Sequence, residues 1–199
     1  MKNKLYLILL ILSGCSHSSE PCTPIKTTGQ IYPLATGNWW VFQHSVFKDL
    51  QGSIKYIYYD TITISRDTVI TGEKWYYHSW WGFLSNRNDG LWEKRRFGIT
   101  SDSLITELFF KYPANTYDTI EVDDSLNKEV VLSADTTVSI PYGCYQGYCY
   151  SISGPVLKKF VYFLIPAIGM VKGEMWLSDG NNNHWGKTEQ WELITANLH

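Results

Sequence analysis

The side chains that could do chemistry are cysteines, histidines and carboxylates, and their spacing matches no catalytic motif. The chain has neither the G-x-S-x-G of a serine nucleophile nor the H-E-x-x-H of a zinc helix. Cys149 could act as a nucleophile only beside a basic histidine, for which the candidates are His44, His78 and His184. Nothing in the spacing brings these groups together, and cysteines of an exported protein are more often oxidised. We therefore predict that the protein has no catalytic residue.

The carboxylate and amide side chains partly match the sequence patterns of two kinds of functional site. Hydrolysis of a glycosidic bond needs a pair of carboxylates. Four glutamates could supply it, although the sequence does not show which of them would pair: Glu93, Glu107, Glu174 and Glu189. Asp179, Asn181 and Asn183 imitate the start of a calcium loop. His184 stands where that loop needs glycine, and Gln190 stands where it needs glutamate. We predict a polar hairpin tip there, no metal site and no cofactor.

The amino terminus has the layout of an export signal. Lys2 and Lys4 precede an unbroken apolar run, residues 5–12, and the small residues Ser13 and Gly14 follow before Cys15. The run is too short to span a bilayer as a helix, which needs ~20 residues. L-S-G-C resembles the lipobox of bacterial lipoproteins, in which the cysteine is diacylated and becomes the first mature residue. The resemblance implies a signal peptide over residues 1–14 and a lipid on Cys15 that anchors the protein to a membrane.

Removal of this leader leaves a mildly acidic chain. It keeps 15 of its 17 Lys and Arg against 19 Asp and Glu, a net charge of −4. No basic block would hold a phosphate backbone, so we expect no nucleic-acid partner. Residues 15–30 are polar and contain proline, which predicts a tether between lipid and domain. The serine after the lipidated cysteine is compatible with sorting to the outer membrane, and which leaflet carries the protein stays open.

Residues 31–199 suit a single all-β domain. Runs rich in Val, Ile, Thr, Tyr and Trp recur between turn signals, and no helical pattern of useful length is present. The expected strands are residues 39–47, 54–65, 68–70, 74–81, 91–97, 103–112, 117–122, 128–132, 136–140, 145–153, 156–164, 170–177 and 185–194. Short strands with hairpin-length links favour a curved antiparallel meander, a half-closed or closed barrel-like sheet. A two-sheet β-sandwich is the alternative.

The stretch W-Y-Y-H-S-W-W-G-F, residues 75–83, is the densest group of aromatic rings. Alternation along a strand would place Trp75, Tyr77, Ser79 and Trp81 on one face. The other face would carry Tyr76, His78 and Trp80. Because the first row is bulkier, we expect it in the core. The second row is then the candidate surface for a sugar or an apolar ligand, although most aromatic residues in strands simply fill cores.

Three cysteines remain when Cys15 is acylated, so at most one intramolecular disulfide can form. On one extended strand, the α-carbons of Cys144 and Cys149 would be ~16 Å apart. A disulfide needs less than about 7 Å. We therefore predict no bond between these two, and we expect any disulfide to join Cys22, on its tether, to Cys144 or Cys149.

Four motifs resemble cell-envelope lipoproteins of Bacteroidota. Residues 32–42, Y-P-L-A-T-G-N-W-W-V-F, are similar to their opening Y-P-L-x-x-G-N-x-W. Residues 138–145, V-S-I-P-Y-G-C-Y, are similar to their V-x-V-P-A-G-x-F, and residues 166–172, P-A-I-G-M-V-K, to their closing G-I-G-x-V-K. W-E-L-I, residues 191–194, resembles their last strand. The resemblance implies a β-rich lipoprotein domain, of the half-barrel kind found in periplasmic carriers, and it brings no catalytic residues.

Two classes of function fit these expectations. The first is a binding or carrier module that holds an apolar or sugar ligand against the aromatic face of the sheet. The second is a structural or assembly lipoprotein that docks onto an envelope protein complex. The aromatic content favours the first class, whereas the lack of clustered polar groups that would fix a ligand favours the second.

Overall fold

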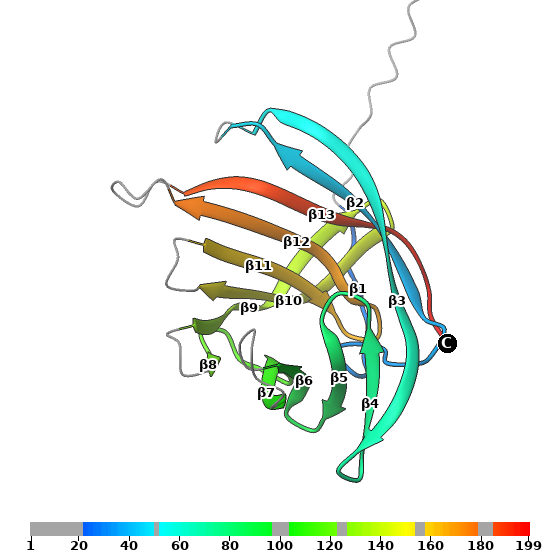
Figure 1. Cartoon of the computed structure of the whole chain (residues 1–199). Helices are drawn as coiled ribbons and strands as arrows, with labels where there is room; N and C mark the ends of the chain where they lie inside the picture. Colours follow the sequence, from blue (N-terminus) through cyan, green and yellow to red (C-terminus); the bar gives the residue numbers. More distant parts are fainter. Residues whose placement is uncertain (1–21, 50–51, 97–103, 123–126, 154–157, 179–184) are drawn as a thin grey trace, which may run out of the picture.

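The computed structural model describes residues 22–49, 52–96, 104–122, 127–153, 158–178 and 185–199 (Figure 1). These residues form strands and their connections. The strands are β1 (Ile25–Lys26), β2 (Trp39–Phe47), β3 (Ile54–Ile70), β4 (Glu73–His78), β5 (Gly82–Arg87), β6 (Gly90–Arg96), β7 (Leu104–Lys111), β8 (Thr119–Val122), β9 (Asn127–Ile140), β10 (Gly143–Ser153), β11 (Lys158–Ile165), β12 (Gly169–Ser178) and β13 (Trp185–Asn197).

All strands belong to one 13-stranded sheet with the order β7-β6-β5-β4-β3-β2-β13-β12-β11-β10-β9-β8, and β1 adds to β10 in parallel. The 17-residue strand β3 joins the two halves, because residues 54–63 pair with β2 and residues 64–70 pair with β4. Figure 1 shows β3 as the long curved ribbon that runs from β2 to β4. The edge strands β7 and β8 leave one unsealed seam, so the sheet is a nearly closed barrel. The predicted curved antiparallel sheet is confirmed, and the sandwich alternative is wrong.

Large apolar side chains fill the inner face of the sheet. Alternate residues of β2, Trp40 and Phe42, are fully buried. They lie opposite Ile62 of β3 and Leu193 of β13 respectively, both also fully buried. The indole of Trp40 donates from Nε1 to the carbonyl oxygen of Ile168 at 2.7 Å, so its burial leaves no unpaired donor. The period-two pattern of β2 therefore sets which residues face the core.

Most predicted strands lie within one to three residues of the observed ones, and residues 39–47 match β2. Two pairs of predicted strands are single strands in the structure. Residues 54–65 and 68–70 both belong to β3, and residues 128–132 and 136–140 both belong to β9. The residues between them continue each strand with an irregular register, at residue 65 of β3 and over residues 132–135 of β9. Strand β5 was not predicted.

The predicted strand over residues 74–81 is wrong at its carboxyl end, because the chain turns after His78. The Nδ1 atom of His78 accepts the backbone N–H groups of Trp80 and Trp81 at 3.3 and 3.1 Å. Its Nε2 lies 3.0 Å from the hydroxyl of Tyr32. Burial lowers the pKa of His78 to about 3, so the ring is neutral, with its proton on Nε2. A neutral histidine thus caps this turn.

Three residues of this stretch lie on the other side from the one predicted, whereas Trp80 is exposed and Trp81 packs against the core, both as predicted. His78 is fully buried, and Tyr76 packs against the core, so neither belongs to an exposed row. Tyr77, expected in the core, is 36% exposed. Trp75 is buried outside the core cluster, with Arg87 and Lys94 over its ring at 5.6 and 4.9 Å. The cationic side chains of Arg87 on β5 and Lys94 on β6 therefore cover this indole on the outer face of the sheet.

Trp80 and Trp81 differ in environment, which predicts different losses on truncation. The ring of Trp81 contacts five other rings with centroids between 4.7 and 6.1 Å: Tyr32, His78, Phe109, Phe110 and Tyr162. Trp80 is 38% exposed. We expect Trp81→Ala to cost about 3–5 kcal/mol of unfolding free energy and Trp80→Ala to cost about 1 kcal/mol. Thermal melts of both variants check this, and equal losses would contradict the assignment.

The segment expected to be a tether is attached to the domain from Cys22 onward. Cys22 and Cys144 form a disulfide with α-carbons 6.1 Å apart, one of the two pairs that the sequence allowed, and Cys149 is a buried free thiol. The hydroxyl of Thr27 donates to the carbonyl oxygen of Pro166 at 2.5 Å. Residues 22–30, which were expected in the tether, are therefore attached to the sheet. The expected signal peptide and Cys15 lie outside the described residues.

Candidate ligand-binding site on the inner face

One row of residues, from β3 to β12, crosses the inner face of the sheet at the boundary between buried and exposed side chains. The registers place Tyr58 of β3 opposite His44 of β2, His44 opposite Trp191 of β13, and Trp191 opposite Gly173 of β12. The ring centroid of His44 lies 4.3 Å from that of Tyr58 and 4.7 Å from that of Trp191. Phe42, on the same face of β2, is fully buried, whereas Tyr58 is 39% exposed. The inner face is thus filled up to Phe42 and accessible beyond His44.

Gly173 gives the indole of Trp191 its position in this row. A β-carbon at residue 173 would lie 3.1 Å from Cε3 of Trp191 and 3.6 Å from the ring of Tyr162 on the next strand. Because the first contact is tighter than normal packing, a side chain there would displace the indole by a few tenths of an ångström. The glycine lets a flat ring lie against the strand.

Trp80 reaches this row from the opposite half of the sheet. It lies in the turn after β4, and its ring centroid is 5.7 Å from that of Phe42 and 6.1 Å from that of Trp191. The turn is held by the backbone N–H of Ser79, which donates to the carbonyl oxygen of Thr63 at 3.1 Å. Rings from three strands and one turn therefore surround the accessible part of the inner face.

Two carboxylates are held beside these rings by His44. Its Nδ1 lies 3.3 Å from Oδ2 of Asp60, and its Nε2 lies 2.9 Å from Oε2 of Glu189. The side chain of His44 is 6% exposed, while those of Asp60 and Glu189 are 33% and 28% exposed. One buried imidazole thus orients two partly exposed carboxylates. Aromatic faces beside fixed hydrogen-bond acceptors are the usual lining of a small-molecule site.

Of the three residues that the sequence proposed for ligand binding, only Trp80 lies in this site. His78 is enclosed in the core, and Tyr76 lies elsewhere. The sequence did not point to Asp60, and it offered His44 and Glu189 only as catalytic candidates; the three residues come from three strands and are up to 145 residues apart. Alternation along each strand gives the face of each residue, but only the cross-strand register brings them together.

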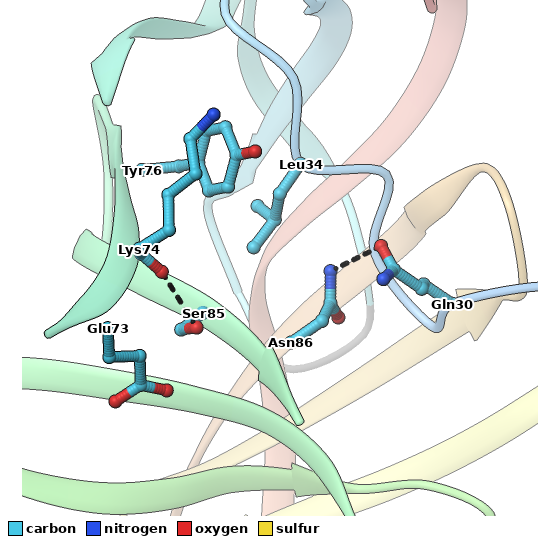
Figure 2. A pocket seen from close by; sticks show the side chains of 7 residues that line it. All are labelled: Gln30, Leu34, Glu73, Lys74, Tyr76, Ser85 and Asn86. Atoms are coloured by element: carbon cyan, nitrogen blue, oxygen red, sulfur yellow. Dashed lines mark hydrogen bonds between the residues drawn. The ribbon is translucent and has the colours of Figure 1, made fainter. Parts of the chain in front are cut away.

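Tyr76 lines a pocket of about 290 Å³ between residues 30–34 and strands β4 and β5 (Figure 2). Figure 2 shows Asn86 donating from Nδ2 to Oε1 of Gln30 at 2.9 Å. Asn86 also donates to the carbonyl oxygen of Tyr32 at 2.7 Å. The hydroxyl of Ser85 donates to the backbone carbonyl oxygen of Lys74 at 2.9 Å. These polar groups bind one another, so the pocket offers fewer groups to a ligand than the inner face does.

Two of the four glutamates proposed as a carboxylate pair do meet. Glu93 of β6 lies opposite Glu107 of β7, and Arg95 contacts both, with Nε 3.2 Å from Oε1 of Glu93. Burial, reinforced by hydrogen bonding to Glu107, raises the pKa of Glu93 to about 8. Glu174 is ion-paired instead with Lys172 and Lys187. Glu93 is only 8% exposed, so its carboxyl group is almost completely shielded from solvent.

A further glutamate lies at the unsealed seam. Glu129 of β9 is fully buried, and neither carboxyl oxygen meets a hydrogen-bond partner in the described chain. Burial, reinforced by the charge of Glu93, raises its pKa to about 9. Beside it the hydroxyl of Tyr150 donates to the carbonyl oxygen of Lys111 at 2.8 Å. At this seam no β-ladder of the described chain joins the two edges of the sheet, but side chains of β9 and β10 contact β7.

Among the described residues, no helix is long and apolar enough to cross a membrane, and no cluster of three or more His, Cys, Asp or Glu has metal-binding geometry. The calcium-loop imitation at residues 179–184 lies outside the described residues.

No family model matches the chain, and no curated protein matches it. Two solved structures are similar. One, described as a lipoprotein of Parabacteroides distasonis, is 10% identical with a TM-score of 0.44, and the match covers 86% of this chain and 100% of that one. The other, described as an exported protein with a YmcC-like fold from Bacteroides fragilis, is 13% identical with a TM-score of 0.43 over 85% of this chain and 100% of that one.

Proposed function

We propose that the chain is a non-catalytic binding protein of the cell envelope, anchored in the outer membrane through Cys15, whose inner face holds a saccharide. The export signal and the L-S-G-C sequence support the location. The observation that carries the ligand assignment is the arrangement around His44, in which the exposed ring of Tyr58 and the partly buried ring of Trp191 flank two carboxylates that the histidine orients.

A sugar ring matches both parts of this site. Its axial C–H groups form an apolar face that can lie on the ring of Tyr58, Trp80 or Trp191. Its hydroxyl groups, at the rim, can donate to the carboxylates of Asp60 and Glu189, and charged acceptors make stronger hydrogen bonds than neutral ones. Since His44 holds both carboxylates in place, little side-chain entropy would be lost on binding.

A wholly apolar ligand fits the site less well. It would cover the carboxylates of Asp60 and Glu189 without offering them a hydrogen bond, and burying unpaired charge is costly. The aromatic rings alone would suit such a ligand, so the two carboxylates decide between the alternatives.

We expect Tyr58→Ala and Trp191→Ala to weaken saccharide binding by on the order of tenfold each, because each removes a stacking surface. Fluorescence and calorimetric titrations of the purified protein with a panel of soluble neutral oligosaccharides measure this. Asp60→Asn should weaken binding through the loss of a charged acceptor.

Matched controls are provided by aromatic residues outside the site. Tyr59 is the neighbour of Tyr58 on the opposite face of β3 and is 65% exposed, and Trp185 is 36% exposed at the start of β13. Tyr59→Ala and Trp185→Ala should bind as the unaltered chain does. Absence of binding to every oligosaccharide, or tight binding of palmitate that Asp60→Asn leaves unchanged, would refute the saccharide assignment.

A further inference from the structure

A second cross-strand row runs beside the row that contains His44, displaced from it along the strands. The registers place Glu189 of β13 opposite Met175 of β12. Met175 in turn lies opposite Phe160 of β11, which lies opposite Ile152 of β10. Directly opposed residues of antiparallel strands have their side chains on one face of the sheet. Because Glu189 binds His44, this second row lies on the inner face.

Three apolar side chains of this row, those of Ile152, Phe160 and Met175, form what we call the apolar strip. All three are partly exposed, whereas Tyr150, on the same face of β10 as Ile152, is fully buried. The ring of Phe160 lies nearly parallel to that of Tyr162, with centroids 6.0 Å apart and 6° between the planes. The strip is therefore the margin of the apolar core that faces solvent.

The apolar strip adjoins the saccharide site directly. Neighbouring strands lie ~4.8 Å apart, so the α-carbon of Ile152 is about 14 Å from that of Glu189 across the sheet. Between these two residues the row consists of Met175 and Phe160. The side chains of the strip offer a sugar no hydrogen-bond partner, whereas a hydrocarbon chain laid on them would remove apolar surface from water. Methionine also adapts readily to the shape of an apolar ligand.

We propose that the saccharide bound beside His44 carries a hydrocarbon chain, so that the ligand is a glycolipid whose chain lies along the apolar strip. This inference rests on the proposed saccharide site and adds the class of molecule to it. The sugar of such a ligand covers the rings and the two carboxylates, and its chain covers the strip. A free oligosaccharide matches the first part only, and a fatty acid matches the second part only.

The charge of the site selects the head group. His44 orients the carboxylates of Asp60 and Glu189, whose charges reinforce burial in raising the pKa of Tyr58. A fatty-acid carboxylate or a phosphate would lie beside these two like charges, and such a juxtaposition is unfavourable. The head group that fits is therefore a neutral sugar or an amino sugar.

Binding of alkyl maltosides to the purified lipoprotein, held in amphipol so that no detergent competes, tests the glycolipid assignment. Methyl, butyl, hexyl and octyl maltoside share one neutral head group and differ only in chain length. In calorimetric titrations, each added methylene should strengthen binding by about two- to fourfold, the range expected for a methylene that is partly or fully removed from water. Palmitate should bind more weakly than octyl maltoside, although its chain is longer.

Two outcomes separate this inference from the saccharide site on which it rests. Equal affinities for methyl and octyl maltoside would overturn the glycolipid and leave the saccharide site standing. Binding of octyl maltoside that Asp60→Asn and Tyr58→Ala leave unchanged would overturn the saccharide site, and the glycolipid with it. Tighter binding of palmitate than of octyl maltoside would overturn the selection of a head group without negative charge.

A variant of the strip separates the chain from the sugar. Met175→Gln keeps the length of the side chain and adds an amide, so it should weaken binding of octyl maltoside at least fivefold and leave that of methyl maltoside unchanged. Ile57→Gln is the matched control, because Ile57 is 46% exposed on the outer face of β3, and it should change neither affinity. Unchanged melting temperatures show that both variants fold. Equal losses in the two variants, or none in Met175→Gln, would overturn the proposal.

Discussion

Glu129→Gln should make stability fall less steeply between pH 5 and pH 8, by the contribution of one buried carboxyl. The folded-state pKa of Glu129 is about 9, against an ordinary value of 4.5, because the carboxyl is buried. The folded chain therefore keeps a proton that the unfolded chain has released, and stability falls as the pH rises from about 4.5 to about 9. Over three pH units this amounts to on the order of 4 kcal/mol.

Glutamine does not titrate, so it removes this contribution and leaves that of Glu93, whose pKa is raised to about 8. Urea unfolding at pH 5, 6, 7 and 8 measures the slope. Glu73→Gln is the control that should leave this slope unchanged, because hydrogen bonding to Arg87 lowers the pKa of Glu73 and its stabilisation is lost only as the pH falls below about 4.5. A Glu129→Gln slope equal to that of the unaltered chain would contradict the burial of a protonated carboxyl at the seam.

Loss of the disulfide should cost about 5 kcal/mol of unfolding free energy. Cys22 and Cys144 are 122 residues apart in sequence, and closing so long a loop removes much of the entropy of the unfolded chain. The double variant Cys22→Ser/Cys144→Ser leaves no unpaired partner thiol. Denaturant unfolding of this variant gives the loss directly.

Reductant supplies the control for the disulfide. It should lower the stability of the unaltered chain to that of the double variant and leave the double variant unchanged. Cys149→Ala, at the buried thiol, should cost much less, because a cysteine behaves as a small apolar residue in a core. Identical unfolding midpoints for the double variant and the unaltered chain would show that the bond does not stabilise this fold.

The strands could be predicted from the sequence because their signal is local. Runs of aromatic and β-branched residues marked β2 residue by residue, and they marked most other strands closely. The face that each strand turns inward was harder to predict. Alternation separates Trp75 from Tyr76, but it does not say which side is the core. Trp75 is buried by Arg87 and Lys94, which reach it from other strands.

The site was less predictable than the fold for the same physical reason. His44 is an ordinary polar residue in its own strand, and only the pairing of β2 with β3 and β13 sets it between Asp60 and Glu189. The disulfide partner Cys22 was predictable, since a strand cannot bend to join Cys144 to Cys149. Apart from this covalent bond, which the small number of cysteines limits to few partners, contacts between strands far apart in sequence could not be predicted.

The strand order also constrains how the chain can fold. Apart from the short β1, every neighbouring pair of strands is consecutive in sequence except β2 and β13. The meanders β2–β7 and β8–β12 can therefore form early from local contacts, while their union waits for residues 185–197. A chain that emerges amino terminus first, from a ribosome or through a translocon, would hold β2 with an open edge until β13 arrives. Because non-local closure is slow, this interval is when the protein is most exposed to aggregation and to proteases.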